Sequence, residues 1–241
     1  MSGLLPRRIG RLWFRVSLAA ATLGRTAPLV PVSRSSGFDR GLPIDRYYIE
    51  DFLRRHGAWP GYSGGDIHGV VMEIGDDAYT RRFGRGHVAR SEVLHVSADN
   101  PAATLVGDLE SGEGVPQEAF DCVICTQTLN VVYDVKAAVR TLRQALKPGG
   151  VLLLTVAGLC PAARPDRDLW GDYWRFTSLA TRRVLEEQFP PSGVQVEAYG
   201  NLASAIAFMR GLAAQDLRAD QLAPADPDYE ILIAARAQRS T

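Results

Sequence analysis

The sequence predicts an α/β protein with a doubly wound, mostly parallel sheet of seven strands. Residues 120–156 carry the strongest part of this prediction, because they read as strand, helix and strand. Asp121 opens a β-branched run, apolar residues then recur at helical spacing after Val135, and a second apolar run begins at Val151. Strands and helices alternate in this way over most of the chain, which is typical of parallel sheets covered by helices on both faces.

The other elements follow from short apolar runs and from helical spacing. The helix over residues 135–146 is expected to stop before Pro148 and two glycines, since Pro cannot continue a helix and Gly tolerates the left-handed C-cap conformation. Thr177 or Ser178 is the expected N-cap of a later helix. The predicted strands cover residues 70–75, 88–92, 104–106, 121–126, 151–156, 194–199 and 229–234, and the predicted helices cover residues 45–55, 135–146, 178–189 and 202–217.

Length and charge limit the class of protein. The 241 residues suit one α/β domain, predicted over residues 44–241, behind an N-terminal extension and linker over residues 1–43. The 27 basic residues balance the 27 acidic ones. No dedicated nucleic-acid partner is therefore predicted.

The N-terminal extension contains an apolar run over residues 16–23, between Arg15 and Arg25. This run is too short to span a bilayer. A short amphipathic helix or mobile lead is the favoured interpretation, and the alternatives are a weak signal-peptide core and peripheral membrane contact. We predict at most peripheral membrane contact through the N-terminus.

The three cysteines predict a reducing, cytoplasmic compartment, because they form no disulfide framework. The Cys122-x-x-Cys125 spacing resembles a redox or zinc pair. On an extended strand, however, these two side chains point to opposite faces. They are expected to act as small apolar residues of the core.

The central unit resembles a known family. Phe120-Asp121 and Val123-Ile124, followed by a helix and the motif LKPGGVLL, are similar to the fourth strand, helix and fifth strand of class I S-adenosylmethionine-dependent methyltransferases. The LKPGG motif before an apolar strand makes this resemblance fairly specific. It implies a Rossmann-like methyltransferase fold with an antiparallel last strand, and S-adenosyl-L-methionine as the cofactor.

Residues 73–79 occupy the place of the family's first motif, acidic-x-Gly-x-Gly-x-Gly. Gly75 matches it, whereas Asp77 and Tyr79 stand where the second and third glycines are expected. Those glycines let the backbone approach the cofactor closely, so side chains here must turn aside. Asp77 could instead accept a hydrogen bond from the cofactor's ammonium group. The resemblance implies cofactor contacts from Glu73, Gly75, Asp76 and Asp77.

Further polar residues at predicted strand ends stand in the order that the family uses. Glu92 is predicted to end the second strand, where a carboxylate can accept hydrogen bonds from two ribose hydroxyls. Asp108 resembles the family's contact to the adenine amine. Each residue also has a plain structural interpretation, as a surface charge or a turn residue. Thr126, Gln127, Arg46 and Tyr47 complete the predicted cofactor site, with Arg46 and Tyr47 closing over the cofactor's carboxylate.

Several motifs resemble one subgroup, the methyltransferase-domain proteins associated with glycosyltransferases and surface-glycan assembly. These motifs are DRYYIE at residues 45–50, EIGD at 73–76, TQTL at 126–129 and WGDYWRFT at 170–177. The resemblance covers residues 38–237, and within the subgroup the missing glycines are normal. It implies a small-molecule or glycan acceptor and a glycosyltransferase as partner.

The aromatic and charged segment at residues 170–177 is the predicted wall of the acceptor site. Aromatic faces can stack on sugar rings, and a carboxylate can deprotonate a hydroxyl, so Asp172 is the predicted catalytic base and His56 a second candidate. The alternative is that Trp174 and Phe176 only anchor the next helix in the core. The predicted acceptor contacts are Asn130, Tyr133, Trp170, Tyr173 and Arg175.

Three functions are weighed on these grounds. The first is methyl transfer from S-adenosylmethionine to a small-molecule or glycan hydroxyl. The second is a non-catalytic module that partners a glycosyltransferase, suggested by the missing glycines. The third, a nicotinamide-dependent oxidoreductase, requires a Gly-rich turn after the first strand, which the sequence lacks. No metal is predicted, because His68, His87 and His95 show no metal-ligand spacing.

Overall fold

The computed structural model describes residues 29–57 and 65–241. The chain divides into two compact units, residues 1–32 and residues 33–241, and the second unit contains every element described below. This unit begins earlier than the predicted domain, because residues 33–43 pack with it. The Arg40 guanidinium, for example, pairs with Asp216 at 2.8 Å. The apolar run at residues 16–23 lies outside the described residues.

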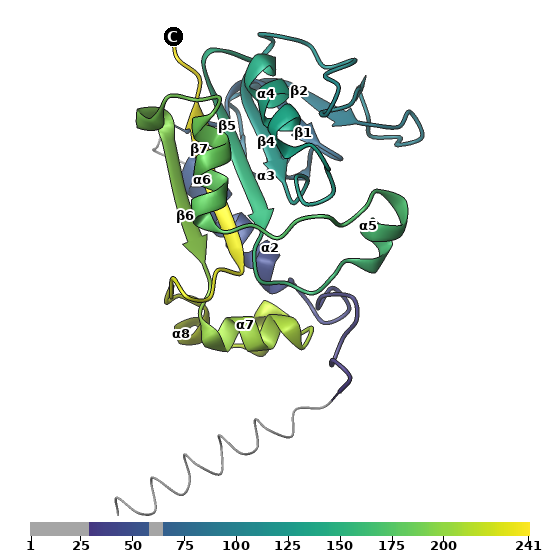
Figure 1. The fold of residues 1–241 in the computed structure, drawn as a ribbon, viewed down its shortest axis with the longest axis vertical. Helices are drawn as coiled ribbons and strands as arrows, with labels where there is room; N and C mark the ends of the chain where they lie inside the picture. The colour runs from purple at the N-terminus through teal and green to yellow at the C-terminus, as the bar shows by residue number, and fades with distance from the viewer. Residues whose placement is uncertain (1–28, 58–64) are drawn as a thin grey trace, which may run out of the picture. The chain divides into compact units, whose positions relative to one another are not determined.

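Among the described residues, seven strands form one sheet in the order β3-β2-β1-β4-β5-β7-β6 (Figure 1). β7 is antiparallel to both of its neighbours, and the other neighbouring pairs are parallel. The predicted fold class is therefore confirmed, including the antiparallel last strand. The strands are β1 (Gly69–Ile74), β2 (Val88–His95), β3 (Leu105–Val106), β4 (Phe120–Thr126), β5 (Leu146–Ala157), β6 (Val194–Tyr199) and β7 (Leu232–Gln238).

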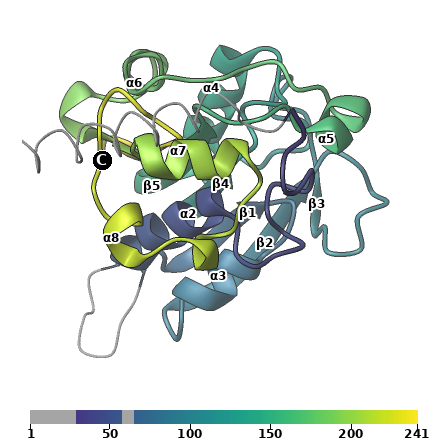
Figure 2. The same cartoon turned by 90° about the horizontal axis from the view of Figure 1, so that it is seen from below.

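Helices cover both faces of this sheet (Figures 1 and 2). On one face, α4 (Val135–Ala145) and α6 (Ser178–Glu186) contribute to one core cluster. On the other face, α2 (Ile44–His56), α3 (Ala78–Phe83), α7 (Leu202–Met209) and α8 (Ala219–Leu222) contribute to a second. The remaining short elements are α5 (Arg164–Leu169), η2 (Pro191–Gly193) and η3 (Ala214–Asp216).

Alternating residues of β4 supply both core clusters. Val123 and Cys125 belong to the cluster under α4 and α6, whereas Cys122 and Ile124 belong to the cluster under α2. Both cysteines are free and fully buried, so the prediction that they point to opposite faces is confirmed. Burial raises the pKa of the Cys125 thiol to about 12, so this group is an inert part of the core.

β2 is longer than the sequence predicted, and this changes the site. It continues past Glu92 to His95, because Val93 and Leu94 are buried and pair with the end of β1. Glu92 therefore lies within the strand, beside Met72, rather than at its carboxyl end. The prediction that Glu92 ends the second strand is wrong.

Three other elements also differ from their predicted bounds. β5 begins at Leu146, directly after α4, so the KPGG residues form an irregular start of the strand. α7 ends at Met209, because Gly211 turns the chain with a φ of 73° and packs against the backbone of Ser33. β7 lies at Leu232–Gln238 instead of residues 229–234. The short helices α3, α5 and α8 were not predicted, since four to six residues are too few for a periodic pattern.

Among the described residues, no helix has the length and apolar character needed to cross a bilayer.

Replacement of Leu142 tests the core beneath α4. This side chain has no exposed surface, so Leu142→Ala is expected to lower the free energy of unfolding by about 2–5 kcal/mol. Leu179→Ala is the matched control, because Leu179 on α6 is 69% exposed and should cost less than about 0.5 kcal/mol. Denaturant unfolding measures both, and equal losses would contradict the described packing.

Candidate functional site

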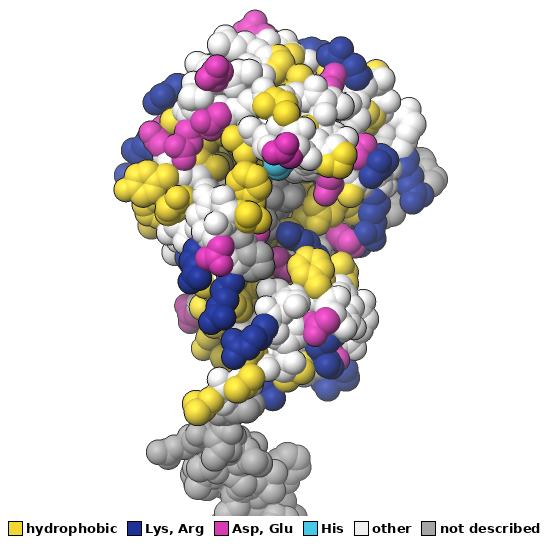
Figure 3. Space-filling model, turned by 90° about the vertical axis from the view of Figure 1, so that its right-hand side faces the viewer, with side chains coloured by type: hydrophobic (Ala, Val, Ile, Leu, Met, Phe, Trp, Pro, Cys, Tyr) yellow, Lys and Arg dark blue, Asp and Glu magenta, His cyan; other side chains and the backbone are white. Residues whose placement is uncertain are grey.

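A cavity of about 500 Å³ lies beyond the carboxyl ends of four parallel strands. Gly75 follows β1, His95 ends β2, Thr126 ends β4 and Ala157 ends β5, and all four residues line the cavity. Figure 3 shows that the molecule is hollowed on this side, with hydrophobic side chains and charges of both signs around the hollow. Ligands of doubly wound sheets bind in this position, where the strand order reverses.

Glu73 fixes the loop that follows β1 without lining the cavity. One carboxylate oxygen accepts hydrogen bonds from the backbone N–H and the hydroxyl of Thr80, both at 2.7 Å, and the other accepts from the Tyr79 N–H at 3.2 Å. These contacts hold the first turn of α3 against the end of β1. Only 2% of Glu73 is exposed, and this burial raises its pKa to about 7 although the hydrogen bonds act in the opposite direction.

Gly75 is the one glycine of the expected motif, and its backbone conformation requires glycine. Its φ is 90°, and a Cβ atom placed there would meet nothing within 4 Å. The residue is therefore selected for its left-handed conformation rather than for lack of space. Its N–H donates to the Leu94 carbonyl at 3.0 Å, and its carbonyl accepts from the Asn100 side chain at 2.7 Å.

Asp76 and Asp77 do not line the cavity, although the family resemblance implied cofactor contacts from both. The Asp76 carboxylate accepts from the Ala78 N–H at 2.8 Å, and the Asp77 carboxylate pairs with Arg81 at 3.0 Å. Both negative charges are thus directed to α3. Asp77 has a φ of −119°, which any residue can adopt, so the second glycine of the motif is not needed for the backbone here.

His95 takes the place at the tip of β2 that was predicted for Glu92. The Glu92 carboxylate accepts from the Thr104 hydroxyl at 2.5 Å and pairs with Arg90 at 3.1 Å, and it does not line the cavity. The imidazole of His95 does line it, and its ring meets the edge of Trp170 with centroids 5.5 Å apart. His95, and not Glu92, is therefore the polar side chain that the end of β2 places at the cavity.

The predicted residues Asp108, Thr126 and Gln127 do line the cavity. The Asp108 carboxylate also shapes the loop after β3, where it accepts from the Glu110 N–H at 2.8 Å. Gln127 has a φ of 51°, and its N–H donates to the Thr155 carbonyl at 2.9 Å. A non-glycine residue in the left-handed region carries strain of the kind that accumulates at binding sites, and here it turns the chain at the cavity wall.

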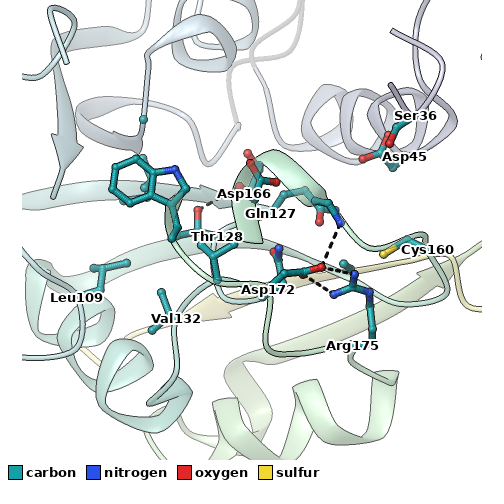
Figure 4. Close-up of a pocket in the computed structure, with 18 of the residues that line it drawn as sticks. Ser36, Asp45, Leu109, Gln127, Thr128, Val132, Cys160, Asp166, Asp172 and Arg175 are labelled. Carbon is teal, nitrogen blue, oxygen red and sulfur yellow. Dashed lines mark hydrogen bonds and ion pairs between the residues drawn. The ribbon is translucent and has the colours of Figure 1, made fainter. Parts of the chain in front are cut away.

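Arg46 lines the cavity and keeps one buried donor without a hydrogen bond. This donor, Nη1, is 3.7 Å from a carboxylate oxygen of Asp45, with which Arg46 forms an ion pair. Asp45 also lines the cavity, where it faces inward beside Ser36, and burial raises the pKa of its carboxyl (Figure 4). Tyr47 lies outside the cavity lining and packs against Tyr48 in the core.

Asn130 is the second buried polar group that the cavity leaves without a partner. Only 6% of the residue is exposed, and its side-chain Oδ1 accepts no hydrogen bond. Its backbone carbonyl accepts from the N–H groups of Tyr173 and Trp174, at 2.8 and 3.2 Å, which ties segment 170–177 to the end of β4.

The predicted acceptor wall divides between the cavity and the outer surface. Trp170, Asp172 and Arg175 line the cavity, whereas Tyr133 and Tyr173 do not. Tyr133 is 66% exposed, and its ring contacts those of Tyr173 and Trp174 outside the cavity. The alternative, anchoring in the core, does not hold for Trp174, which is 40% exposed, but it holds for Phe176, which is partly buried and packs against the core cluster under α4 and α6.

Asp172 forms a bidentate ion pair instead of facing the cavity as a free base. Its two carboxylate oxygens accept from Arg175 at 2.6 and 2.8 Å, and one of them also accepts from the Ala163 N–H at 3.1 Å. The Arg175 hydrogen bonds hold the pKa of Asp172 below its usual value. A carboxylate with a lowered pKa is a weak proton acceptor, which argues against Asp172 as the catalytic base.

Several residues that line the cavity were not predicted from the sequence. They are Asp45, His95, Cys160 and Asp166, among others. Of these, Asp45 could have been predicted, because it belongs to the DRYYIE motif. His95 was missed because the second strand was predicted to end at Glu92. Cys160 and Asp166 lie in a connection without a regular sequence pattern.

No group of three metal-binding side chains occurs among the described residues. His56, the second candidate base, lies outside the cavity lining, and its Nδ1 is 2.7 Å from Asp66. The carboxylates of the cavity are spread over separate loops, so the site offers hydrogen-bond acceptors rather than a ligand cage.

The strand order with an antiparallel β7 and the cavity at the switch point define a Rossmann-like methyltransferase fold. A family model described as "Methyltransferase domain" matches residues 49–193, which is more than half of the chain. The chain belongs to this methyltransferase-domain family. A search of curated proteins found no significant match.

Solved methyltransferases share the fold at low sequence identity. N-methyltransferase NodS from Bradyrhizobium japonicum, in complex with S-adenosylhomocysteine, matches with a TM-score of 0.52 and 16% identity over 87% of this chain and 94% of that chain. A methyltransferase from Mesorhizobium loti matches with a TM-score of 0.50 and 18% identity over 84% of this chain and 100% of that chain.

Phosphoethanolamine N-methyltransferase 2 of Haemonchus contortus, in complex with S-adenosyl-L-methionine, also matches, with a TM-score of 0.52 and 12% identity over 81% of this chain. The match spans 53% of that longer chain, so only about half of that enzyme has a counterpart here. At these identities the likeness concerns the fold.

The raised pKa of Glu73 predicts a pH-dependent stability. Between about pH 4.5 and pH 7 the unfolded chain loses this proton while the folded protein keeps it, so the folded state binds more protons and its stability falls as pH rises. This carboxyl should lower the free energy of unfolding by on the order of 3 kcal/mol across that range. Denaturant unfolding of the wild type and Glu73→Gln at pH 5 and pH 8 measures the effect. The same pH dependence in both proteins would contradict it.

Proposed function

We propose that the chain transfers a methyl group from S-adenosylmethionine to a hydroxyl of a small molecule or glycan. The observation that carries the proposal is the Arg46–Asp45 ion pair, in which Arg46 Nη1 is buried without a hydrogen bond, at a cavity beyond the carboxyl ends of β1, β2 and β4. A buried guanidinium donor without a partner is costly unless an anionic group satisfies it. Family membership supports the same reaction class.

The residues that line the cavity suit the chemistry of this cofactor. Arg46 would bind the carboxylate of its amino-acid portion, and the adjacent Asp45 would accept from its ammonium group, so that consecutive residues match both charges. His95 and Asp108 would face the ribose and the adenine amine, and Gln127 the sulfur-bearing centre. When bound, the cofactor supplies a methyl group that its positive sulfur already activates, so positioning accounts for much of the rate.

The acceptor would occupy the part of the cavity near Trp170 and Asn130. The Asn130 Oδ1 would accept a hydrogen bond from an acceptor hydroxyl or amine, and the indole ring offers an apolar face. A hydroxyl acceptor must lose its proton, which the Asp166 carboxylate at the cavity wall would take, whereas a neutral amine can be methylated before it loses one. A glycan acceptor and a glycosyltransferase partner stay predictions from the sequence resemblance.

The main argument for the alternative, a non-catalytic module that partners a glycosyltransferase, does not hold. It was suggested by Asp77 and Tyr79 in place of glycines, but the Asp77 carboxylate pairs with Arg81 away from the cavity. The loop therefore leaves the cavity open without those glycines.

Ligand binding to Arg46 variants tests the proposed site. Calorimetry is expected to detect S-adenosylhomocysteine binding to the wild type, with an affinity about 10- to 100-fold weaker for Arg46→Gln because a charge-assisted contact is lost. 5′-Methylthioadenosine, which lacks the amino-acid portion, should bind both proteins equally.

Arg54→Gln is the matched control, since Arg54 lies on the same helix and does not line the cavity. Equal weakening of both ligands by Arg46→Gln would mean that Arg46 supports the fold rather than the cofactor's carboxylate. No heat with S-adenosylhomocysteine at millimolar concentration would overturn the proposed function.

Restoring the expected glycine should not improve binding. Asp77→Gly removes a side chain that points to Arg81, so the affinity for S-adenosylhomocysteine is expected to change less than about threefold, as for a surface substitution. The same titration measures this variant. A gain of tenfold or more would show that the native loop obstructs the cofactor.

A further inference from the structure

The connection between β5 and α6 makes a long excursion that carries one wall of the cavity. It contains α5, and its residues Ala163, Asp166 and Trp170 line the cavity. Figure 1 shows α5 standing away from the sheet, joined to it by two extended segments. The WGDYWRFT motif forms the segment that returns to the sheet. Contacts made by this motif therefore help to set where the excursion lies.

A network of hydrogen bonds closes the neck of the excursion. The Asp172 carboxylate accepts from both Arg175 Nη atoms and from the Ala163 N–H, and Arg175 Nη2 also donates to the Pro161 carbonyl at 3.1 Å. The outgoing residues 161–163 are thereby joined to the returning residues 172–175. Figure 4 shows the paired carboxylate and guanidinium at the cavity wall.

Beyond this neck, the excursion has little to hold it. Arg164 and the residues from Asp166 to Leu169 are all exposed, so these side chains of α5 add little to the packing of the domain. Among the described residues, the one ring contact from this part to the body joins Trp170 to His95. Segments with few buried contacts open at low free-energy cost.

The side chain of Asp172 is well suited to a fixed contact. Only 3% of it is exposed, against 31% for Arg175, and the bidentate geometry gives the pair one defined orientation. Gly171, directly before it, has a φ of 100° and lies against the Tyr173 ring, so the turn into the neck is one that glycine adopts readily.

We propose that Asp172 and Arg175 are positioning residues that clip the neck of this excursion and so hold Trp170 and Asp166 over the cavity as a movable wall. The proposal rests on the proposed function for its consequence, which is that the wall controls entry and release of the cofactor and acceptor. It assigns Asp172 a role that needs no proton transfer. A wall of this kind excludes water from the site when it is closed.

Hydrogen exchange tests the clip without a ligand. In Asp172→Asn and Arg175→Gln, amide exchange in residues 163–172 is expected to rise about 10-fold, with exchange in β4 and β5 unchanged. The double variant should add little to either single one, because both remove the same contact. Arg175→Lys, which keeps the charge but not the fork geometry, should lie between wild type and Arg175→Gln.

Asp220→Asn is the control, since it breaks the exposed Arg218–Asp220 pair far along the chain and should leave exchange in residues 163–172 unchanged. Unchanged local exchange in Asp172→Asn would overturn the proposal. Faster exchange throughout the sheet would overturn it too, because the pair would then support the whole domain.

Binding kinetics test the consequence for the site. Stopped-flow measurement with S-adenosylhomocysteine should give association and dissociation rates that both rise in Asp172→Asn, by about 3- to 10-fold, with a smaller change in Kd. A change in dissociation alone would indicate a direct contact instead of a movable wall. If the wild type binds no S-adenosylhomocysteine, the proposed function fails, whereas the exchange experiment still decides the clip.

Discussion

The reversal of strand order between β1 and β4 is the constraint on which the site depends. These two strands are neighbours, yet the chain between them turns outward through β2 and β3, and the chain after β4 turns the other way through β5. The connections therefore diverge at the carboxyl ends of the strands and leave a space that no helix fills. Gly75 and Thr126 both line that space, because they lie at the carboxyl ends of two strands that pair directly.

Three carboxylates of residues 73–77 shape the loop that follows β1 beside this space. Glu73 holds the start of α3 through Thr80, Asp76 closes a turn onto Ala78, and Asp77 pairs with Arg81. In glycine-rich loops, the flexibility of the glycine backbone lets the loop take the required shape. Here side-chain hydrogen bonds direct the acidic groups away from the cavity, which explains how a loop with one glycine keeps the cavity open.

The two arginines of the cavity differ in their hydrogen bonds. Arg175 donates two hydrogen bonds to Asp172, whereas Arg46 forms a longer ion pair with Asp45, at 3.7 Å, and keeps one buried donor without a hydrogen bond. A guanidinium with an unsatisfied donor suits a ligand that carries a carboxylate. The Asn130 Oδ1 is a hydrogen-bond acceptor without a donor, so a ligand that donates a hydrogen bond would suit it.

The sequence alone determined the sheet, the order of its elements and the opposite faces of Cys122 and Cys125, because apolar periodicity and helix stops are local signals. It also identified Gly75, Asp108 and Arg46, which lie at the ends of elements with clear patterns. Only the tertiary structure showed that Glu92 lies within β2 and not at its end, because the end of β2 depends on its pairing with β1. The tertiary structure also showed that Asp172 pairs with Arg175. This contact depends on a fold that brings both side chains and the Ala163 N–H together where the excursion leaves and rejoins the domain.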